Sequence, residues 1–257
     1  MYRERFDLTG STAFLTGAGR GIGLAAAEAL GEYGAKLIIS DHDPAVLEAG
    51  QAELAAKGFK AEAILLDVTK PADVTRIADD LDARYGAVDI LIANAGIARP
   101  DTPGEDMPDE AWLRMIDVNL NGVFWSCRAF GKHMLTHGRG SIVTVGSMSG
   151  IISNKPQRQA HYNASKAAVH HLTRSLAGEW GARGVRINAV APTYVDTMMS
   201  RGGFTDPTLF PIWMENTPMK RVATAEEIAA VILFLASPAS SIMTGAVVQA
   251  DAGYCVW

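Results

Sequence analysis

The sequence predicts one α/β domain built on a doubly wound parallel sheet with helices on both faces. Short apolar runs alternate along the chain with longer segments of helical spacing, as repeated strand and helix units require. The apolar runs are nearly continuous Val, Ile, Leu and Ala, which is typical of strands that are covered on both faces. The length of 257 residues fits one such domain, residues 1–257, without a linker or repeat.

Seven segments are expected to form the strands of this sheet. The residues between them are long enough for crossover helices, so all seven strands are expected to be parallel. In chain order the expected strands are Thr12–Thr16, Lys36–Ser40, Ala61–Leu66, Val88–Ala93, Ser141–Val145, Val185–Val190 and Ala246–Ala250.

Six segments are expected to form the helices. Pro44, Pro71 and Pro108 each suit a first helical turn. Residues 192–222 hold four prolines and are too long for a turn, so they are expected to form an irregular lid over a site. The expected helices are Gly21–Tyr33, Pro44–Lys57, Pro71–Tyr85, Pro108–Thr136, Gln157–Gly181 and Thr224–Ala236, and Gly34, Gly58, Gly86 and Gly138 follow four of their ends.

Composition excludes several classes of partner. Lys and Arg number 23 against 28 Asp and Glu, and the net charge of −5 gives no basic surface for nucleic acid. The longest apolar run, Ile228–Ala236, is too short to cross a bilayer, and no signal peptide is recognisable. Cys127 and Cys255 suit a reducing compartment, so a cytoplasmic protein is expected. The six histidines, His170 and His171 included, show no ligand spacing and are interpreted as surface or capping residues, with no metal site.

A glycine-rich turn follows the first expected strand and opens a helix. Glycines let the backbone approach a pyrophosphate closely, and the helix N-terminus attracts its charge. The turn predicts a dinucleotide cofactor, held by Gly17, Gly19, Arg20, Gly21, Ile22 and Gly23.

Asp41, at the end of the second expected strand, bears on the choice of cofactor. A carboxylate there accepts hydrogen bonds from the adenosine ribose and repels a 2′-phosphate, which favours NAD. Arg20 favours NADP instead, because a guanidinium in the glycine turn pairs with that phosphate. The fixed carboxylate is the stronger effect, so NAD is the expected cofactor.

The spacing Thr-Gly-x3-Gly-x-Gly resembles the short-chain dehydrogenase/reductase family. The resemblance covers nearly the whole chain and implies a Rossmann-like fold and a homotetramer. Within the family, Gly146-Ser-Met-Ser-Gly150 and the C-terminal Gly253-Tyr-Cys-Val-Trp257 look most like bacterial NAD-dependent polyol dehydrogenases of the galactitol type. Further family motifs follow in order: Asp67-Val68, Asn94-Ala95-Gly96, Asn119, Ser147, Tyr162-x3-Lys166 and Asn188-Ala-Val-Ala-Pro192.

The resemblance also implies residue roles. Asp67 and Val68 would flank the adenine, and Thr197 would reach the nicotinamide carboxamide. Asn119 would anchor a water in a proton relay to solvent. The remaining implied cofactor contacts are Asn94, Ala95, Gly96, Tyr162, Lys166, Pro192 and Val195.

The expected roles of Tyr162 and Lys166 also follow from their spacing and chemistry, independently of the family resemblance. Residues at i and i+4 share a helix face, and an ammonium beside a phenol favours the phenolate. Tyr162 is therefore the expected general base, with its pKa lowered by Lys166, which would also hold the nicotinamide ribose. Ser147 would polarise the substrate oxygen, although Ser149 is a rival for that role.

The expected activity is NAD-dependent oxidation of a secondary alcohol in a polyol or sugar to the ketose. The expected substrate contacts are Ser147, Ser149, Asn154, Gln159, Tyr162 and Thr193, with Tyr194 and Trp213 as further pocket residues. The alternatives are an NAD(P)H-dependent reductase of keto groups on acyl or other small carbonyl compounds, and an NAD-binding sensor without turnover.

Two departures from the family pattern concern backbone shape. Thr193 stands where the family usually has glycine, and Asp251-Ala252-Gly253 replaces Asp-Gly-Gly. If position 193 needs a positive φ, Thr193 would be strained.

Overall fold

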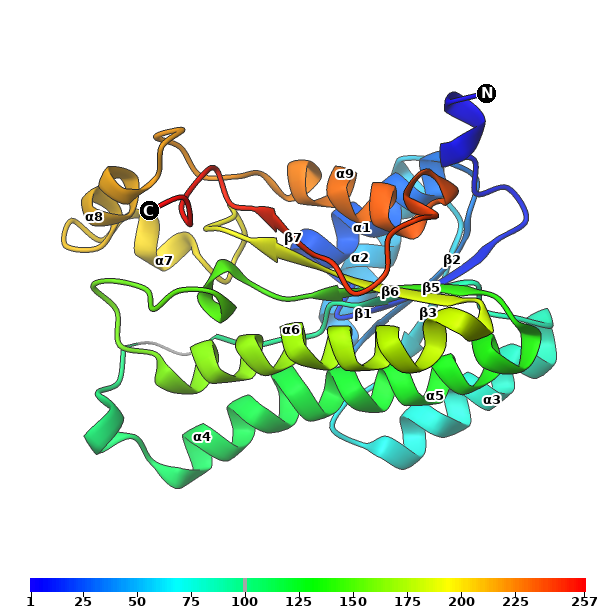
Figure 1. Cartoon of the computed structure of the whole chain (residues 1–257), viewed down its shortest axis with the longest axis horizontal. Coiled ribbons are helices and arrows are strands. Elements are labelled where there is room, and N and C mark those ends of the chain that lie inside the picture. The colour runs from blue at the N-terminus through cyan, green and yellow to red at the C-terminus, as the bar shows by residue number, and fades with distance from the viewer. Residues whose placement is uncertain (99–100) are drawn as a thin grey trace.

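The computed structural model describes residues 1–98 and 101–257 and shows a seven-stranded parallel sheet (Figure 1). The strand order is β3-β2-β1-β4-β5-β6-β7. All seven expected strands are present, with ends that move by a residue or two. Their bounds are Thr12–Thr16 (β1), Lys36–Asp41 (β2), Ala61–Leu65 (β3), Ile90–Ala93 (β4), Gly140–Val145 (β5), Val185–Pro192 (β6) and Val247–Ala250 (β7).

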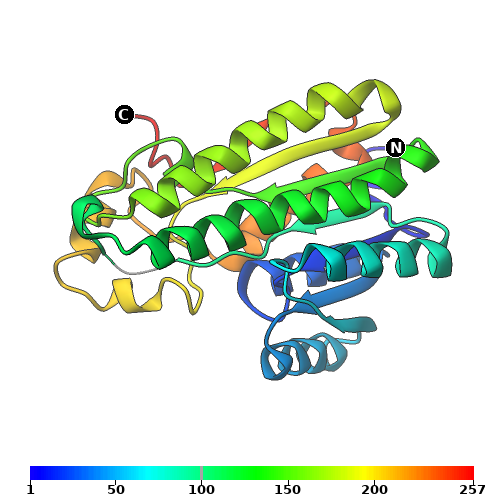
Figure 2. The same cartoon turned by 90° about the horizontal axis from the view of Figure 1, so that it is seen from below.

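Helices cover both faces of the sheet, which confirms the predicted fold class. One layer holds α1, α2 and α9, and the other holds α3, α4, α5 and α6, with α5 and α6 side by side in Figure 2. No helix of the described residues is long and apolar enough to cross a membrane. The bounds are Gly21–Glu32 (α1), Pro44–Ala56 (α2), Pro71–Tyr85 (α3), Asp109–Ile116 (α4), Gly122–His137 (α5), Ala160–Trp180 (α6) and Ala225–Ala236 (α9).

Two apolar cores lie on the two sides of the sheet. Leu15 and Ile39 face the layer of α1 and α9, and Phe14 and Ile38 face the layer of α3 and α5. Phe14 stacks on Phe130 of α5 with ring centroids 4.5 Å apart. Because both strand faces are buried, continuous apolar runs were the correct signal for the central strands.

The strand order reverses between β1 and β4. The chain runs outward to β3 and returns to the other side of β1, so the loops after β1 and β4 diverge and leave a crevice. Ligands of open parallel sheets bind at such a crevice. The glycine turn follows β1 and Asn94 follows β4, so the fold brings both expected cofactor loops to this point.

The helix expected at Pro108–Thr136 is interrupted. A π-helical turn at Asp117–Asn121 separates α4 from α5, and Pro108 precedes α4 rather than starting it. Apolar spacing runs through this stretch, so the sequence did not indicate the break. The extra residue of a π turn changes the direction of the side chains, and such turns are frequent at functional sites.

The expected lid, residues 192–222, is more regular than predicted. Pro192 still belongs to β6, and two short helices follow, Arg201–Phe204 (α7) and Phe210–Asn216 (α8). These helices lie beside the carboxyl ends of the strands, near the C-terminus (Figure 1). The next strand-like contact pairs Val195 with Ala223 and closes the segment. The segment expected to be irregular therefore contains two short helices, and its role as a lid stays a prediction.

The anticipated strain at Thr193 is absent. Among non-glycine residues of the described chain, positive φ occurs at Lys220 and Ala252, and Thr193 is not among them. The left-handed residue is instead Ala252, with φ of 54°, at the second departure from the family pattern. The local cost of a Cβ at positive φ therefore lies beside the C-terminal segment and not after β6.

Candidate active site

The glycine turn has the shape of an anion cradle. Gly17 has a φ of 60°, and a Cβ on Gly23 would lie 2.5 Å from the Gly17 carbonyl oxygen. Asn94 holds this carbonyl from β4, with its Nδ2 donating to Gly17 O at 2.7 Å and to Thr16 O at 3.0 Å. Helix α1 begins at Gly21, so its first N–H groups and its positive dipole end face the crevice. These residues fit the pyrophosphate of a dinucleotide.

Asp41 is fixed beside that turn. Its carboxylate accepts the backbone N–H of Gly19 at 3.4 Å and of Asp43 at 3.2 Å, and it contacts His42 Nδ1 at 3.1 Å. Asp41 is buried, whereas the Arg20 side chain is exposed. The negative charge is therefore positioned by the fold, and the arginine is not.

The loop after β4 joins the cofactor residues to the catalytic ones. The N–H of Ala95 donates to Thr16 Oγ1 at 3.1 Å, which fixes the loop against β1. A Cβ on Gly96 would lie 3.5 Å from Lys166 Nζ and 3.4 Å from Asn119 Oδ1. Asn94-Ala95-Gly96 thus touches the glycine turn at one end and the catalytic group at the other.

Other expected cofactor residues lie around the same crevice. Asp67 is held by Thr69, which donates to its Oδ1 from N and Oγ1 at 3.0 and 2.8 Å. Val68 is buried, and its Cγ2 lies where a Cβ on Gly122 would be. Thr197 of the lid lies close to the glycine turn: a Cβ added to Gly21 would be 3.3 Å from Thr197 Cγ2.

Tyr162 and Lys166 lie one turn apart on α6, as predicted. Lys166 is buried, and its Nζ donates to Val145 O at 2.8 Å and lies 5.8 Å from the Tyr162 ring centroid. The Ser147 side chain lies close enough to the Tyr162 hydroxyl to lower the pKa of the phenol. The three side chains therefore meet at the carboxyl end of β5.

The expected effect of Lys166 on Tyr162 does not occur in the chain alone. Burial raises the pKa of Tyr162, and the Ser147 side chain lowers it only in part. Burial also lowers the pKa of Lys166 to about 8. The Lys166 ammonium lies 5.8 Å from the Tyr162 ring centroid and donates to Val145 O, so the effect of burial on the Tyr162 pKa is larger than its own. The predicted lowering of the Tyr162 pKa was therefore wrong.

Ser147, and not its rival Ser149, faces Tyr162. Ser147 has an extended φ of −171° and precedes a 3-10 turn at Met148–Gly150. Its Oγ accepts the Ser149 N–H at 3.1 Å, and the Ser147 side chain also lowers the pKa of the Tyr162 hydroxyl. Ser149 lies at the edge of the substrate residues, with its Oγ 3.5 Å from Gln159 Nε2.

Asn119 lies in the π turn and is fully buried. Its Oδ1 accepts the Ile97 N–H at 2.8 Å, and its Nδ2 donates to Ile97 O at 2.9 Å and to Ser165 Oγ at 3.2 Å. The side chain thus ties the loop after β4 to α6. Ser165, which the sequence analysis missed, completes this link three residues after Tyr162.

Several of the expected substrate residues form one hydrogen-bonded network. Gln159 Nε2 donates to Asn154 Oδ1 at 3.1 Å, and Asn154 Nδ2 donates to Tyr194 Oη at 3.2 Å. Gln157 joins it, donating to Tyr194 Oη at 2.8 Å and accepting the indole N–H of Trp213 at 3.0 Å. The network connects the loop after β5 with the lid.

Aromatic packing holds the lid on this network. Tyr194 stacks on Trp213 of α8 with ring centroids 3.8 Å apart, and Phe204 of α7 meets Trp213 edge to face. Tyr254 packs against Tyr194 from the C-terminal segment. In the described part of the chain, the buried hydroxyls of Thr193 and Tyr254 have no hydrogen-bond partner, so both have bonding capacity for a ligand.

The interpretation of the histidines needs a correction. His161 and His170 are buried, because both belong to the inner face of α6. Only His171 of the adjacent pair is exposed. Among the described residues, no group of His, Cys, Asp and Glu is arranged to hold a metal ion.

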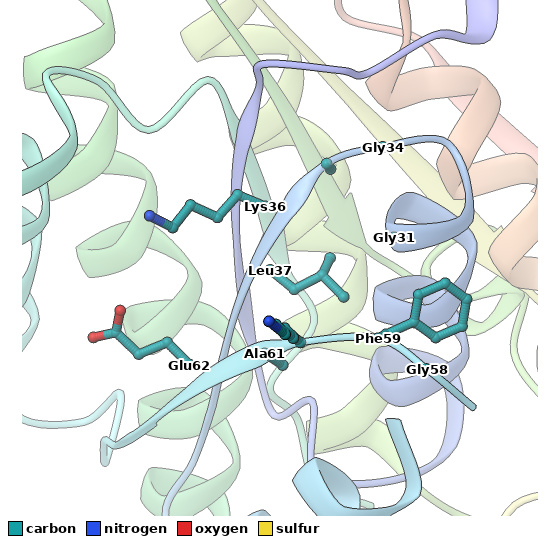
Figure 3. A pocket seen from close by; sticks show the side chains of 10 residues that line it. Gly31, Gly34, Lys36, Leu37, Gly58, Phe59, Ala61 and Glu62 are labelled. Atoms are coloured by element: carbon teal, nitrogen blue, oxygen red, sulfur yellow. The ribbon is translucent and has the colours of Figure 1, made fainter. Parts of the chain in front are cut away.

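A cavity of about 610 Å³ lies at the opposite end of the sheet, where β2 and β3 begin. Figure 3 shows Lys36 and Glu62 pointing to one side of these strands, while Phe59 lies toward α1. Three of its lining residues are glycines, Gly31, Gly34 and Gly58. The cavity is open because glycines have no side chain to fill it. Its lining includes none of the expected cofactor, catalytic or substrate residues.

Comparison with known proteins identifies close relatives. A family model described as enoyl-(acyl carrier protein) reductase matches residues 17–255. Galactitol 2-dehydrogenase of Rhizobium johnstonii is 49% identical, and the alignment covers 100% of this chain and 99% of that protein. Galactitol 2-dehydrogenase (L-tagatose-forming) of Cereibacter sphaeroides is 47% identical with the same coverage. The crystal structure of a gluconate 5-dehydrogenase from Burkholderia cenocepacia in complex with NADP and tartrate is 33% identical, with full coverage of both chains and a TM-score of 0.93.

Proposed function

The chain belongs to the short-chain dehydrogenase/reductase family, and from that premise we propose that it oxidises a secondary alcohol of a polyol to the ketose with a nicotinamide cofactor. The observation that carries the proposal is the meeting of Ser147, Tyr162 and Lys166 beside a hydrogen-bonded polar network. Two relatives that are 49% and 47% identical bear the name galactitol 2-dehydrogenase.

In the proposed reaction, the substrate would lose a proton to Tyr162 and a hydride to the cofactor. Ser147 donates a hydrogen bond to the substrate hydroxyl and keeps it next to Tyr162, which removes its proton. Lys166 supplies positive charge near the resulting oxyanion, and Asn119 holds the loop and helix between which protons pass to solvent. The side chains of Ser147, Tyr162, Lys166 and Asn119 are expected to act together in the reaction, because each is held in place by the backbone or by a buried neighbour.

The cofactor is held by the chain's glycine turn and by the loop after β4. Gly17, Gly23 and the start of α1 receive the pyrophosphate, while Asp67 and Val68 flank the adenine. The nicotinamide, when bound, would supply the hydride acceptor and a positive charge that favours the Tyr162 phenolate. The buried Lys166 would hold the ribose.

The polar network supports a polyol as the substrate. Two amides, Asn154 and Gln157, both donate to Tyr194 Oη, so the phenol's own proton is the group left to donate. A substrate with a hydroxyl on each carbon satisfies such groups, whereas an apolar ketone leaves them unpaired. Tyr194 is half-buried and Trp213 is buried, but they do not form the apolar wall that a reductase of apolar ketones needs, because their polar atoms belong to the network.

Product identification tests the proposal. Incubation with galactitol or another polyol of four to six carbons and either nicotinamide cofactor is expected to yield a ketose, identified by NMR, and an equal amount of reduced cofactor. Binding of the cofactor without a product from any polyol or ketone would support the sensor alternative. Reduction of acyl ketones alone would support the reductase.

We also propose that NAD is the preferred cofactor, and Asp41→Ser tests this. Removal of the buried carboxylate is expected to weaken NAD binding and to shift the ratio of kcat/KM values toward NADP by roughly tenfold or more. Asp43→Ser is the matched control, because Asp43 caps α2 two residues later. A wild-type enzyme that prefers NADP would contradict the proposal that Asp41, and not Arg20, decides the cofactor preference.

The proposed assembly is a homotetramer in the cytoplasm. Trp112 and Leu113 of α4 are exposed, and Trp257 at the C-terminus is 81% exposed in the single chain, so apolar surface remains to be covered. Cys127 and Cys255 are free thiols, as suits a reducing compartment. Light scattering at micromolar concentration is expected to give the mass of four chains, and a stable monomer would contradict the assembly.

A further inference from the structure

The buried ring of His170 lies under the loop that carries Ser147. The Ser147 N–H donates to His170 Nε2 at 3.4 Å, and Gly150 lies against the same ring. A Cβ on Gly146 would overlap Nε2, and a Cβ on Gly150 would lie 2.7 Å from Cε1. The two glycines of Gly146-Ser-Met-Ser-Gly150 therefore leave the space that the imidazole fills.

His170 is one of three α6 residues that hold the end of β5. Lys166 Nζ donates to Val145 O at 2.8 Å, and Thr173 Oγ1 lies 2.8 Å from Thr144 Oγ1. His170 lies between them along the helix, and it is the one that reaches beyond the strand to the catalytic loop. The helix that carries the proposed base thus also fixes the serine opposite it.

This contact requires an uncharged ring. A protonated imidazole donates from both nitrogens and has no lone pair for the Ser147 N–H. Burial, with the positive charges of Lys166 and Arg174 on the same helix, lowers the pKa of His170 to about 4. The ring therefore stays neutral at physiological pH and keeps its acceptor.

We propose that His170 is a positioning residue for the reaction, whose Nε2 holds the Ser147 backbone so that the Ser147 hydroxyl meets Tyr162. This inference rests on the proposed function, in which Ser147 polarises the substrate oxygen. Loss of the acceptor frees the extended Ser147 backbone to rotate and moves the hydroxyl away from the phenol. The effect is confined to the chemical step, because the glycine turn that receives the cofactor lies after a different strand.

Three variants separate the acceptor from the bulk of the ring. His170→Phe fills the same space without an acceptor, and it is expected to lower kcat about 10- to 100-fold while the KM for the cofactor stays within about twofold. His170→Gln keeps a carbonyl acceptor at similar reach and is expected to retain most of kcat. His171→Gln, at the exposed neighbour, is expected to leave both constants unchanged.

A double-mutant cycle shows whether His170 acts through Ser147. In a Ser147→Ala background, His170→Phe is expected to cause no further loss of kcat, because the group that it positions is already absent. Equal losses in both backgrounds, or a His170→Phe enzyme with wild-type kcat, would overturn the inference. Unchanged kcat in Ser147→Ala alone would instead contradict the proposed function. If His170→Phe is recovered unfolded, His170→Met takes its place in the same cycle.

Discussion

Replacement of Tyr162 by Phe is expected to remove nearly all turnover. The variant keeps the ring on α6 but loses the hydroxyl that lies near Ser147 and takes the substrate proton. A positioned general base contributes about 10²- to 10⁴-fold, so a loss of about 10³-fold in kcat is expected. Cofactor affinity, measured by fluorescence titration, should stay near wild type, because the glycine turn and Asp41 are untouched.

Tyr33→Phe is the matched control for this substitution. Tyr33 follows the end of α1, is 40% exposed, and packs its ring on Phe6, a contact that phenylalanine retains. Its kcat should equal that of the wild type. If a folded Tyr162→Phe enzyme kept more than about 10% of kcat, the phenol would not be the base.

Arg186→Met is expected to have the largest effect on stability. The guanidinium donates six hydrogen bonds of 3.0–3.2 Å, to the hydroxyls of Ser141 and Ser240 and to four backbone carbonyls around the end of α9. Methionine keeps the apolar stem but removes all six hydrogen bonds, and the four carbonyls keep only their other donors. A hydrogen bond from a charged donor contributes about 1.5–3 kcal/mol, and the cost of burying the guanidinium offsets part of that sum, so a total loss of roughly 3 kcal/mol in the free energy of unfolding is expected.

Chemical denaturation of Arg186→Met and Arg183→Met measures this effect. Arg183 lies three residues earlier and is exposed, so its replacement should change the free energy of unfolding by no more than about 0.5 kcal/mol. Equal stability of the two variants would show that the carbonyls find other donors when Arg186 is absent.

The structural features that were predicted correctly from the sequence are those that depend on local sequence patterns. Continuous apolar runs located all seven strands, because both faces of the central strands are buried, while the edge strands β3 and β7 are only partly buried. The glycine turn and the Tyr162 and Lys166 spacing were found because each is a short motif whose geometry follows from one element. Pro44 placed the start of α2 correctly for the same reason.

Contacts between distant segments were not predictable. His170 is 23 residues from its partner Ser147, and Arg186 bonds carbonyls some 50 residues away, so neither pairing leaves a local signal. The π turn around Asn119 interrupts a helix whose apolar spacing does not change. Ala252, and not Thr193, has the positive φ, because the backbone after β6 is set by pairing with β7 rather than by residue type.

The most direct measurement of the central claim compares kcat/KM for galactitol and for 2-hexanol with NAD in one assay. Both offer a secondary alcohol to Tyr162, but only galactitol pairs the groups around Asn154 and Tyr194. The expected result is a preference for galactitol, or for another polyol of four to six carbons, of roughly 100-fold or more. A broad panel of polyols and sugars that is inert, with efficient reduction of a hydrophobic ketone, would contradict the account.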